Sequence, residues 1–398
     1  MTRDEEELRR ALEARSGAPA PEFQARLTAA LAAGPPASRL VPVMALVAAT
    51  ILTLATVGTL VWAGSAVRGV RHGGITSSAR TVTPSPMPTV SIGQPVAGVL
   101  TPPPGPTPMP DTVTLSAPSR DVVWALVADM YLYSSTDGGN TWQQRPLPPD
   151  PPGSPFSDVS FVDDQNGWLL RGGPGATQCS FGGATIWHTF DAGTTWQRVV
   201  YVDYQHEIAQ SIGFAQCKEN LSFIDVTHGF VDGWDDNGRP TIYRTADGGV
   251  TWSARTLADP PGFTTYGSGD ALRAGRVKSF GPTLLVQAYG MQPNGFHGYV
   301  FQSSDGGSTW TYLADLSRPL DVTFVTATRW IEIVGHMEST DSGRTWHPFT
   351  SDYHSQAAGA APQVVFADPL IGYATVRSDI QRTIDGGAHW THIRTPGM

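Results

Sequence analysis

The sequence predicts an all-β fold, a β-propeller of about six four-stranded blades, preceded by one transmembrane helix and a proline-rich linker. One octapeptide, Ser/Thr-x-Asp-x-Gly-x-Thr-Trp, recurs six times, at residues 135–142, 189–196, 245–252, 303–310, 339–346 and 383–390. Between the copies, apolar and polar residues alternate in short runs separated by turn residues, as they do in strands. Successive octapeptide tryptophans lie 54, 56, 58, 36 and 44 residues apart. Because four strands need about 35 to 45 residues, each copy predicts one blade.

The octapeptide has the composition of a hairpin turn. Asp137 can accept hydrogen bonds from nearby backbone N–H groups, and Gly138 and Gly139 supply positive φ angles. Trp142 is large enough to pack against the neighbouring sheet. Only the last copy departs from the pattern, with His389 in place of threonine. We therefore expect a structural role for the aspartate and tryptophan of every copy: Asp137 and Trp142, Asp191 and Trp196, Asp247 and Trp252, Asp305 and Trp310, Asp341 and Trp346, and Asp385 and Trp390.

A calcium site is the competing interpretation of these turns, because Asp-Gly-rich loops bind calcium in other proteins. A calcium loop needs several oxygen ligands, and each copy offers one carboxylate. The ten histidines are scattered without metal-ligand spacing. The sequence therefore predicts no metal site and no cofactor.

Composition excludes one class of partner. The 398 residues carry a formal net charge of −9, and residues 111–398 hold 29 acidic against 17 basic residues, a balance of −12. Nucleic-acid-binding domains need a basic stripe, which is missing here.

The chain begins with a polar segment and an apolar one. Residues 1–40 contain two short stretches with helical spacing and are expected to form a cytoplasmic tail, which is either only solvated or binds a partner. Residues 41–63 carry no charge over 23 positions, enough to cross a hydrocarbon core about 30 Å thick. A cleaved signal peptide is the alternative, but the segment starts far from Met1 and is long for one. Because arginines flank both ends, orientation rests on the long domain that follows, which places the N-terminus in the cytoplasm.

Residues 64–110 are expected to be a linker. Ten of the 27 residues from 84 to 110 are proline, mixed with threonine, serine and glycine. This composition favours an extended chain and cannot form a core.

Residues 111–398 hold the repeats. The unit is clearest at 158–200, where runs at 159–162, 167–171, 185–188 and 195–199 predict four strands. The same order returns at 221–257 and 363–395, and less regularly at 112–147, 275–313 and 320–349.

These motifs resemble a known family. The octapeptides resemble the Asp-box, or bacterial neuraminidase repeat. The longer pattern, Phe161-x-Asp163, Gly167-Trp168 and then the octapeptide at 189–196, is similar to the photosystem II stability and assembly factor-like group of propellers. The resemblance covers residues 111–398 and implies a propeller fold. Its members include scaffolds, receptors and hydrolases, so it implies no single function.

An enzyme is the less favoured reading. A sialidase-like site would need three arginines, a Tyr/Glu pair and a Phe/Tyr-Arg-Ile-Pro signature, and Arg120 and Arg145 stand in other contexts. Any glycosidase needs two carboxylates several ångströms apart, whereas the adjacent Asp235 and Asp236 should point apart. We therefore expect no catalytic residues, and a glycoside hydrolase if the protein is an enzyme at all.

The long connections should lie together on one face, opposite the octapeptides. With strands a to d in each blade, the b–c and d–a connections share that face, and binding residues usually lie in such loops. Aromatic and acidic residues there are candidates for binding a partner, with packing of their own loops as the alternative: Tyr204, His206, Trp234, Asp235, Asp236, Tyr266, Tyr289, Phe296 and, more loosely, Glu207 and Tyr353. Cys179 and Cys217 fall in neighbouring loops of this face, where a disulfide is reasonable for an oxidising compartment.

Together these features predict a single-pass bacterial membrane protein with an extracytoplasmic propeller. Its expected role is non-catalytic binding or scaffolding of a protein partner at the outer membrane surface. The alternative is a carbohydrate-active protein, either a hydrolase or a lectin that binds a glycan.

Overall fold

A computed structural model describes residues 92–101, 112–149, 157–172, 183–203, 210–213, 217–234, 241–263, 272–292, 295–316, 322–354, 362–376 and 379–397. The expected tail, the expected span at 41–63 and most of the expected linker lie outside these residues. Within them, no helix has the length and apolar character needed to cross a membrane.

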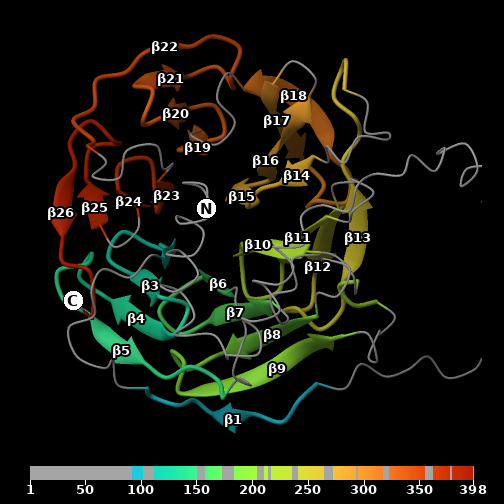
Figure 1. Cartoon of the computed structure of the whole chain (residues 1–398), viewed down its shortest axis with the longest axis vertical. Coiled ribbons are helices and arrows are strands. Elements are labelled where there is room, and N and C mark those ends of the chain that lie inside the picture. Colours follow the sequence, from blue (N-terminus) through green and yellow to red (C-terminus); the bar gives the residue numbers. More distant parts are fainter. Residues whose placement is uncertain are drawn as a thin grey trace, which may run out of the picture. The chain divides into compact units, whose positions relative to one another are not determined.

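The described residues form six antiparallel sheets arranged in a ring (Figure 1). Blades 1 to 3 are built as follows: β2 (Val113–Ser116), β3 (Val123–Val127), β4 (Tyr131–Ser135) and β5 (Gln143–Arg145); β6 (Ser157–Phe161), β7 (Gly167–Gly172), β8 (Ala184–Thr189) and β9 (Thr195–Val202); β10 (Cys217–Phe223), β11 (Gly229–Trp234), β12 (Thr241–Thr245) and β13 (Ser253–Thr256).

Blades 4 to 6 follow the same order. They contain β14 (Arg273–Ala274), β15 (Lys278–Phe280), β16 (Thr283–Gln292), β17 (Gly295–Ser303) and β18 (Thr311–Leu316); β19 (Val322–Phe324), β20 (Trp330–Glu332), β21 (Met337–Ser339) and β22 (His347–Pro348); β23 (Gln363–Phe366), β24 (Gly372–Val376), β25 (Asp379–Thr383) and β26 (Thr391–Ile393). In blade 4, β14 and β15 both pair with β16 and together take the place of one inner strand. The prediction of an all-β propeller of about six blades is therefore confirmed, and the number of blades is six in the described residues.

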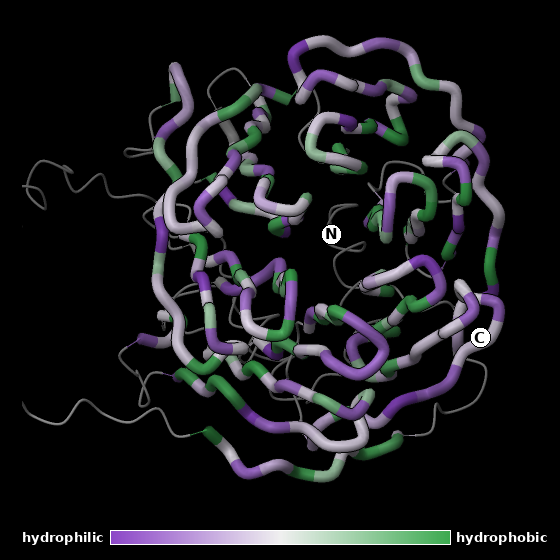
Figure 2. The backbone as a smooth tube through the Cα atoms, turned by 180° about the vertical axis from the view of Figure 1, so that it is seen from behind, coloured by the Kyte–Doolittle hydropathy of each residue, from purple (hydrophilic) through white to green (hydrophobic). Residues whose placement is uncertain are grey.

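The core lies between the blades. Hydrophobic and hydrophilic segments alternate along the strands (Figure 2), and the buried apolar residues form six clusters, each shared by two neighbouring sheets. The cluster of Val113, Leu115 and Tyr133 with Tyr373 and Ile380 joins blade 1 to blade 6 and closes the ring. Every sheet therefore buries both faces against its neighbours, which a single sheet could not do alone.

The six octapeptides fold into the same turn between the third and fourth strands. In the second copy, the Thr189 hydroxyl donates to Asp191 at 3.0 Å and accepts from the Gly193 N–H at 2.8 Å. Asp191 in turn accepts the backbone N–H of Thr195 at 2.8 Å and its hydroxyl at 2.7 Å. The last copy keeps this pattern, because the N–H and Nδ1 of His389 reach Asp385 at 2.9 and 2.6 Å. Each carboxylate is thus bound to its own turn.

These hydrogen bonds favour the ionised carboxylate. The side-chain and backbone hydrogen bonds from Thr141 lower the pKa of Asp137 to about 2. The octapeptide tryptophans pack against the preceding blade, and Trp196, which is fully buried, is an example. Its Nε1 donates to the Pro146 carbonyl of blade 1 at 3.1 Å.

Two octapeptides carry a side chain where the turn favours glycine. The residue after the aspartate has a positive φ in the described copies, and it is Ala192 (φ 57°) or Ser342 (φ 63°) in two of them. Left-handed backbone costs an L-residue roughly 1–2 kcal/mol. Ser342→Gly should therefore raise the free energy of unfolding by about 1 kcal/mol, measured by chemical denaturation of the two proteins. Gly138→Ala should lower the free energy of unfolding, because Gly138 has a φ of 71° and an added Cβ would lie 2.7 Å from the Arg382 side chain. A loss of stability in Ser342→Gly would contradict this account of the turn.

Part of the expected linker belongs to the propeller. Residues Val96–Ala97 form strand β1, which pairs with the outer strand β9 of blade 2. The neighbouring Val99 exchanges backbone hydrogen bonds of 2.7 and 3.1 Å with Leu147, which follows the outer strand of blade 1. Gly98 passes so close to blade 2 that a Cβ there would lie 2.5 Å from the Gly193 carbonyl oxygen. The segment 92–101 therefore ties two blades together at the rim, which the proline-rich composition around it did not reveal.

One interface contains a buried histidine. The ring of Trp168 stacks on that of Phe223 of blade 3, with centroids 3.6 Å apart. It also stacks on the ring of His188 of its own blade, with centroids 4.0 Å apart. His188 is buried, and its Nε2 makes no hydrogen bond to the residues that the structure describes. Burial lowers the pKa of His188 to about 4.

Candidate functional site

Strand direction gives the propeller two distinct faces. The a–b turns and the octapeptide turns share one, here called the turn face, and the b–c and d–a connections share the other, here called the loop face. The described part of the loop face is formed mainly by the strand ends next to these connections.

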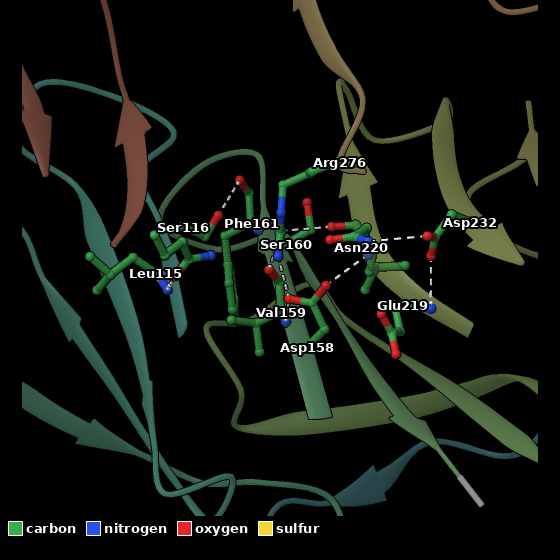
Figure 3. A network of polar contacts seen from close by, with 12 residues as sticks. Leu115, Ser116, Asp158, Val159, Ser160, Phe161, Glu219, Asn220, Asp232 and Arg276 are labelled. Atoms are coloured by element: carbon green, nitrogen blue, oxygen red, sulfur yellow. Dashed lines mark hydrogen bonds and ion pairs between the residues drawn. The ribbon is translucent and has the colours of Figure 1, made fainter. Parts of the chain in front are cut away.

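Four carboxyl groups from three blades approach one another at the loop face, close to the axis. They are Asp129 between β3 and β4, Asp158 on β6, Glu219 on β10 and Asp232 on β11, and they are called the acidic cluster below. Figure 3 shows Asp158, Glu219 and Asp232 with Arg276 above Asp158. The mutual proximity appears in their electrostatics, since the charge of Asp158 raises the pKa of each of the other three.

Both carboxylate oxygens of Asp158 are bound to residues of other blades. One oxygen accepts the N–H of Leu221 in blade 3 at 2.7 Å, and the other pairs with Arg276 of blade 4 at 2.5 Å. The same guanidinium donates to the Leu221 carbonyl at 2.7 Å and the Val159 carbonyl at 3.2 Å. Since Asp158 is 3% exposed, this ion pair joins the inner strands of blades 2, 3 and 4.

The carboxyl group of Asp232 also has hydrogen-bond partners in the protein. Its carboxylate accepts the Glu219 N–H at 2.9 Å and the Asn220 side-chain amide at 3.1 Å. Asn220 adopts a left-handed φ of 55° at an irregularity in the β10–β11 register and also donates to the Ala274 carbonyl of blade 4. Burial raises the pKa of Asp232 well above its usual range.

The carboxyl groups of Glu219 and Asp129 differ from those of Asp158 and Asp232. Their carboxyl groups make no hydrogen bond to the described residues, and both are partly exposed. Burial is the main cause that raises the pKa of each, with Arg273 opposing it at Glu219 and Arg171 opposing it at Asp129. Perturbed carboxyl groups of this kind concentrate at functional sites.

An aromatic pair lies beside Glu219. Tyr289 of β16 is directly opposite Arg273 of β14, and its ring lies 5.7 Å from that of Phe296 on β17. Burial raises the pKa of Tyr289, and the negative charges of Glu219 and Asp232 add to the rise. Phe296 is 43% exposed. The β16–β17 hairpin, with strands of 10 and 9 residues, thus carries an accessible aromatic pair to the acidic cluster.

The other candidate binding residues are less informative. Tyr204, His206, Glu207, Asp235, Asp236 and Tyr266 lie outside the described residues, as does Cys179. Trp234 and Cys217 are backbone partners at the ends of β11 and β10. The expected disulfide is therefore not tested. The prediction that Tyr353 is a surface residue for binding is wrong. Tyr353 is 7% exposed, and its ring packs edge-on against that of Trp390 with centroids 5.5 Å apart, so it belongs to the core between blades 5 and 6.

None of the four carboxyl residues of the acidic cluster is among the candidates predicted from the sequence. One signal was available, because Asp232 is a charged residue in the strand Phe230–Gly233, which is otherwise apolar or glycine. In the part of the chain that the structure describes, no three potential ligand side chains are grouped as a metal site would require.

The arginines near the cluster are mostly occupied. Arg171 donates to the Asp129 carbonyl and to the Ser157 hydroxyl, and Arg276 is held as described above. Farther away, Arg120 pairs with Asp368 and Arg145 donates to Ser134. The contacts of Arg171, Arg276 and Arg120 join different blades, whereas that of Arg145 lies within blade 1.

Comparisons with known proteins agree on the propeller and give no single function. Residues 106–273 match the family model described as the DUF6242 beta propeller domain, which is less than half of the chain. A xyloglucanase from a Paenibacillus species is 24% identical over 275 residues, covering 58% of this chain and 25% of the relative. The xyloglucanase Xgh74A of Acetivibrio thermocellus is 27% identical over 247 residues, covering 53% and 28%. The chain thus spans about a quarter of the length of these curated relatives.

Solved structures show weaker likenesses. YCF48 bound to D1 peptide has 17% identity and a TM-score of 0.39, with 73% of this chain and 96% of that one covered. The SapL1 lectin in complex with alpha methyl fucoside has 15% identity and a TM-score of 0.45, with 73% and 98% covered. At these scores neither structure assigns a function to the chain.

Proposed function

We propose that the protein is a non-catalytic, membrane-anchored propeller of the Asp-box type, whose loop face binds a protein partner outside the cytoplasm. The common turn of the six octapeptides supports the Asp-box assignment. The uncharged residues 41–63 support an anchor, and the long domain that follows supports an N-terminus in the cytoplasm.

The observation that carries the binding role is the aromatic pair Tyr289–Phe296. Aromatic side chains that are accessible at one end and carried by paired strands are typical anchors of protein interfaces. Behind them, the ion pair Asp158–Arg276 and the bonds of Asp232 fix the inner strands. The framework is therefore rigid, and little ordering is needed when a partner binds.

Removing either ring of the Tyr289–Phe296 pair should weaken binding of the protein partner. Tyr289→Ala and Phe296→Ala, each in the full-length chain solubilised in detergent, should weaken capture of the partner at least about tenfold, or roughly 1.4 kcal/mol. The measurement is quantitative pull-down from membrane extracts, followed by titration of the captured protein. Phe190→Ala is the matched control, because Phe190 is 57% exposed on the turn face. Equal capture by all variants would exclude the aromatic pair as the contact.

The alternative is a carbohydrate-active protein, and one observation favours it. Glu219 and Asp129 are two partly buried carboxyl groups with raised pKa values, and a protonated carboxyl is what a glycosidase needs as its acid. Because the curated relatives are xyloglucanases, xyloglucan is the first glycan to test. Turnover that is lost in Glu219→Gln would replace the scaffold proposal with this one.

A further inference from the structure

The charged residues on the inner strands are distributed unevenly along the axis. The inner strands of blades 1, 5 and 6 (β2, β19 and β23) carry none. The carboxylates Asp158 and Glu219 come near the start of their strands and therefore lie toward the loop face. Blade 4 supplies Arg273 on β14, Lys278 on β15 and, between these two strands, Arg276.

Lys278 lies toward the turn face. It stands shortly before the turn at Gly281, and its Nζ donates to the Phe366 carbonyl at 2.7 Å. Phe366 ends the inner strand of blade 6, so the side chain crosses the axis past blade 5. Lys278 is half-buried as a residue, and burial of its ammonium group is the main cause of its lowered pKa.

This ammonium group has no carboxylate partner among the described residues. Asp158, on the inner strand of blade 2, is already bound to Arg276 and to backbone N–H groups. The aspartates of the a–b turns are used as well: Asp163, Asp225 and Asp368 accept N–H groups of their own turns. Lys278 has three N–H donors and one neutral acceptor. Enclosed cations are normally paired.

We propose that the axis at Lys278 is a binding site for a small anion of carboxylate size, held by the ammonium group next to the Arg276 guanidinium. Lys278 reaches Phe366 at the turn-face end of β23, and the site does not depend on the proposed partner-binding function. It also accounts for the placing of one of only two lysines of the chain, in a domain of net negative charge, where no carboxylate of the described residues contacts it.

The electrostatics of the lysine give the expected pH dependence. Burial, helped by the positive charge of Arg276, lowers the pKa of Lys278 to about 8. An anion bound to the ammonium form stabilises the folded state below this pH, and the effect is lost as the amine loses its proton above it.

The test is thermal unfolding of the full-length chain in detergent, followed by tryptophan fluorescence at increasing sodium acetate. At about pH 7, Tm of the wild type should rise saturably by about 2–4 °C. Lys278→Met should lack this rise, whereas Arg255→Met, which removes a half-exposed charge on the outer strand β13, should keep it. The same acetate curve in all three proteins would overturn the proposal.

The wild type alone provides a second test if Lys278→Met does not fold. The saturable rise should be present at about pH 7 and absent at about pH 9.5, since the amine is then largely neutral. An equal rise at both pH values would exclude Lys278 as the anion ligand.

Discussion

Replacing Arg276 by methionine should destabilise the propeller by about 3–5 kcal/mol, because it leaves the buried carboxylate of Asp158 without its partner. The guanidinium also serves the Val159 and Leu221 carbonyls, so three blades lose a common contact. The measurement is the free energy of unfolding in denaturant. Arg255→Met is the control and should change it by less than about 0.5 kcal/mol.

A double-mutant cycle distinguishes the ion pair from simple loss of packing. Asn at position 158 can still accept the Leu221 N–H, but it carries no charge. Asp158→Asn combined with Arg276→Met should therefore cost less than the sum of the two single changes by at least about 1 kcal/mol. Additive losses would show that the pair does not hold the inner strands as a unit.

The second large effect is acid lability caused by His188. Its pKa is about 4 in the folded protein and near 6.5 in the unfolded chain. Because the unfolded chain binds the proton more readily, stability is full above pH about 6.5 and falls as the pH drops toward 4. The loss is on the order of 3 kcal/mol.

His188→Phe should abolish this fall while keeping the stack on Trp168. The difference in unfolding free energy between about pH 7 and pH 4.5 should shrink by about 2–3 kcal/mol. His354→Phe, at an exposed position, should leave the difference unchanged. A wild-type pH profile retained in His188→Phe would show that the acid lability has another source.

The repeated parts of the fold could be predicted because they are local. Each octapeptide contains the donors and acceptors of its own turn, such as Thr189, Asp191 and Thr195. Strand runs such as 167–171 differ from the observed β7 by one residue. The number of blades then follows from the number of copies.

The unrepeated parts could not be predicted, because their partners are distant in sequence. Val96 pairs with Trp196, and nothing in two residues identifies that partner. The acidic cluster draws on segments from Asp129 to Asp232, and Lys278 binds a backbone carbonyl, which has no signature in a sequence. Tyr353 was predicted as a surface aromatic residue, but it packs against the distant Trp390 ring in the core.

Strand β1 also decides how mechanical load enters the domain. Tension transmitted from the amino-terminal side of the chain arrives along β1, whose direction is antiparallel to β9. The bonds from Gly93 to Arg198 and from Gly98 to Thr194 lie across that direction, so they are sheared together instead of being peeled one by one. A force on the rim is thus resisted by several bonds at once, and the ring of blades is spared until they fail.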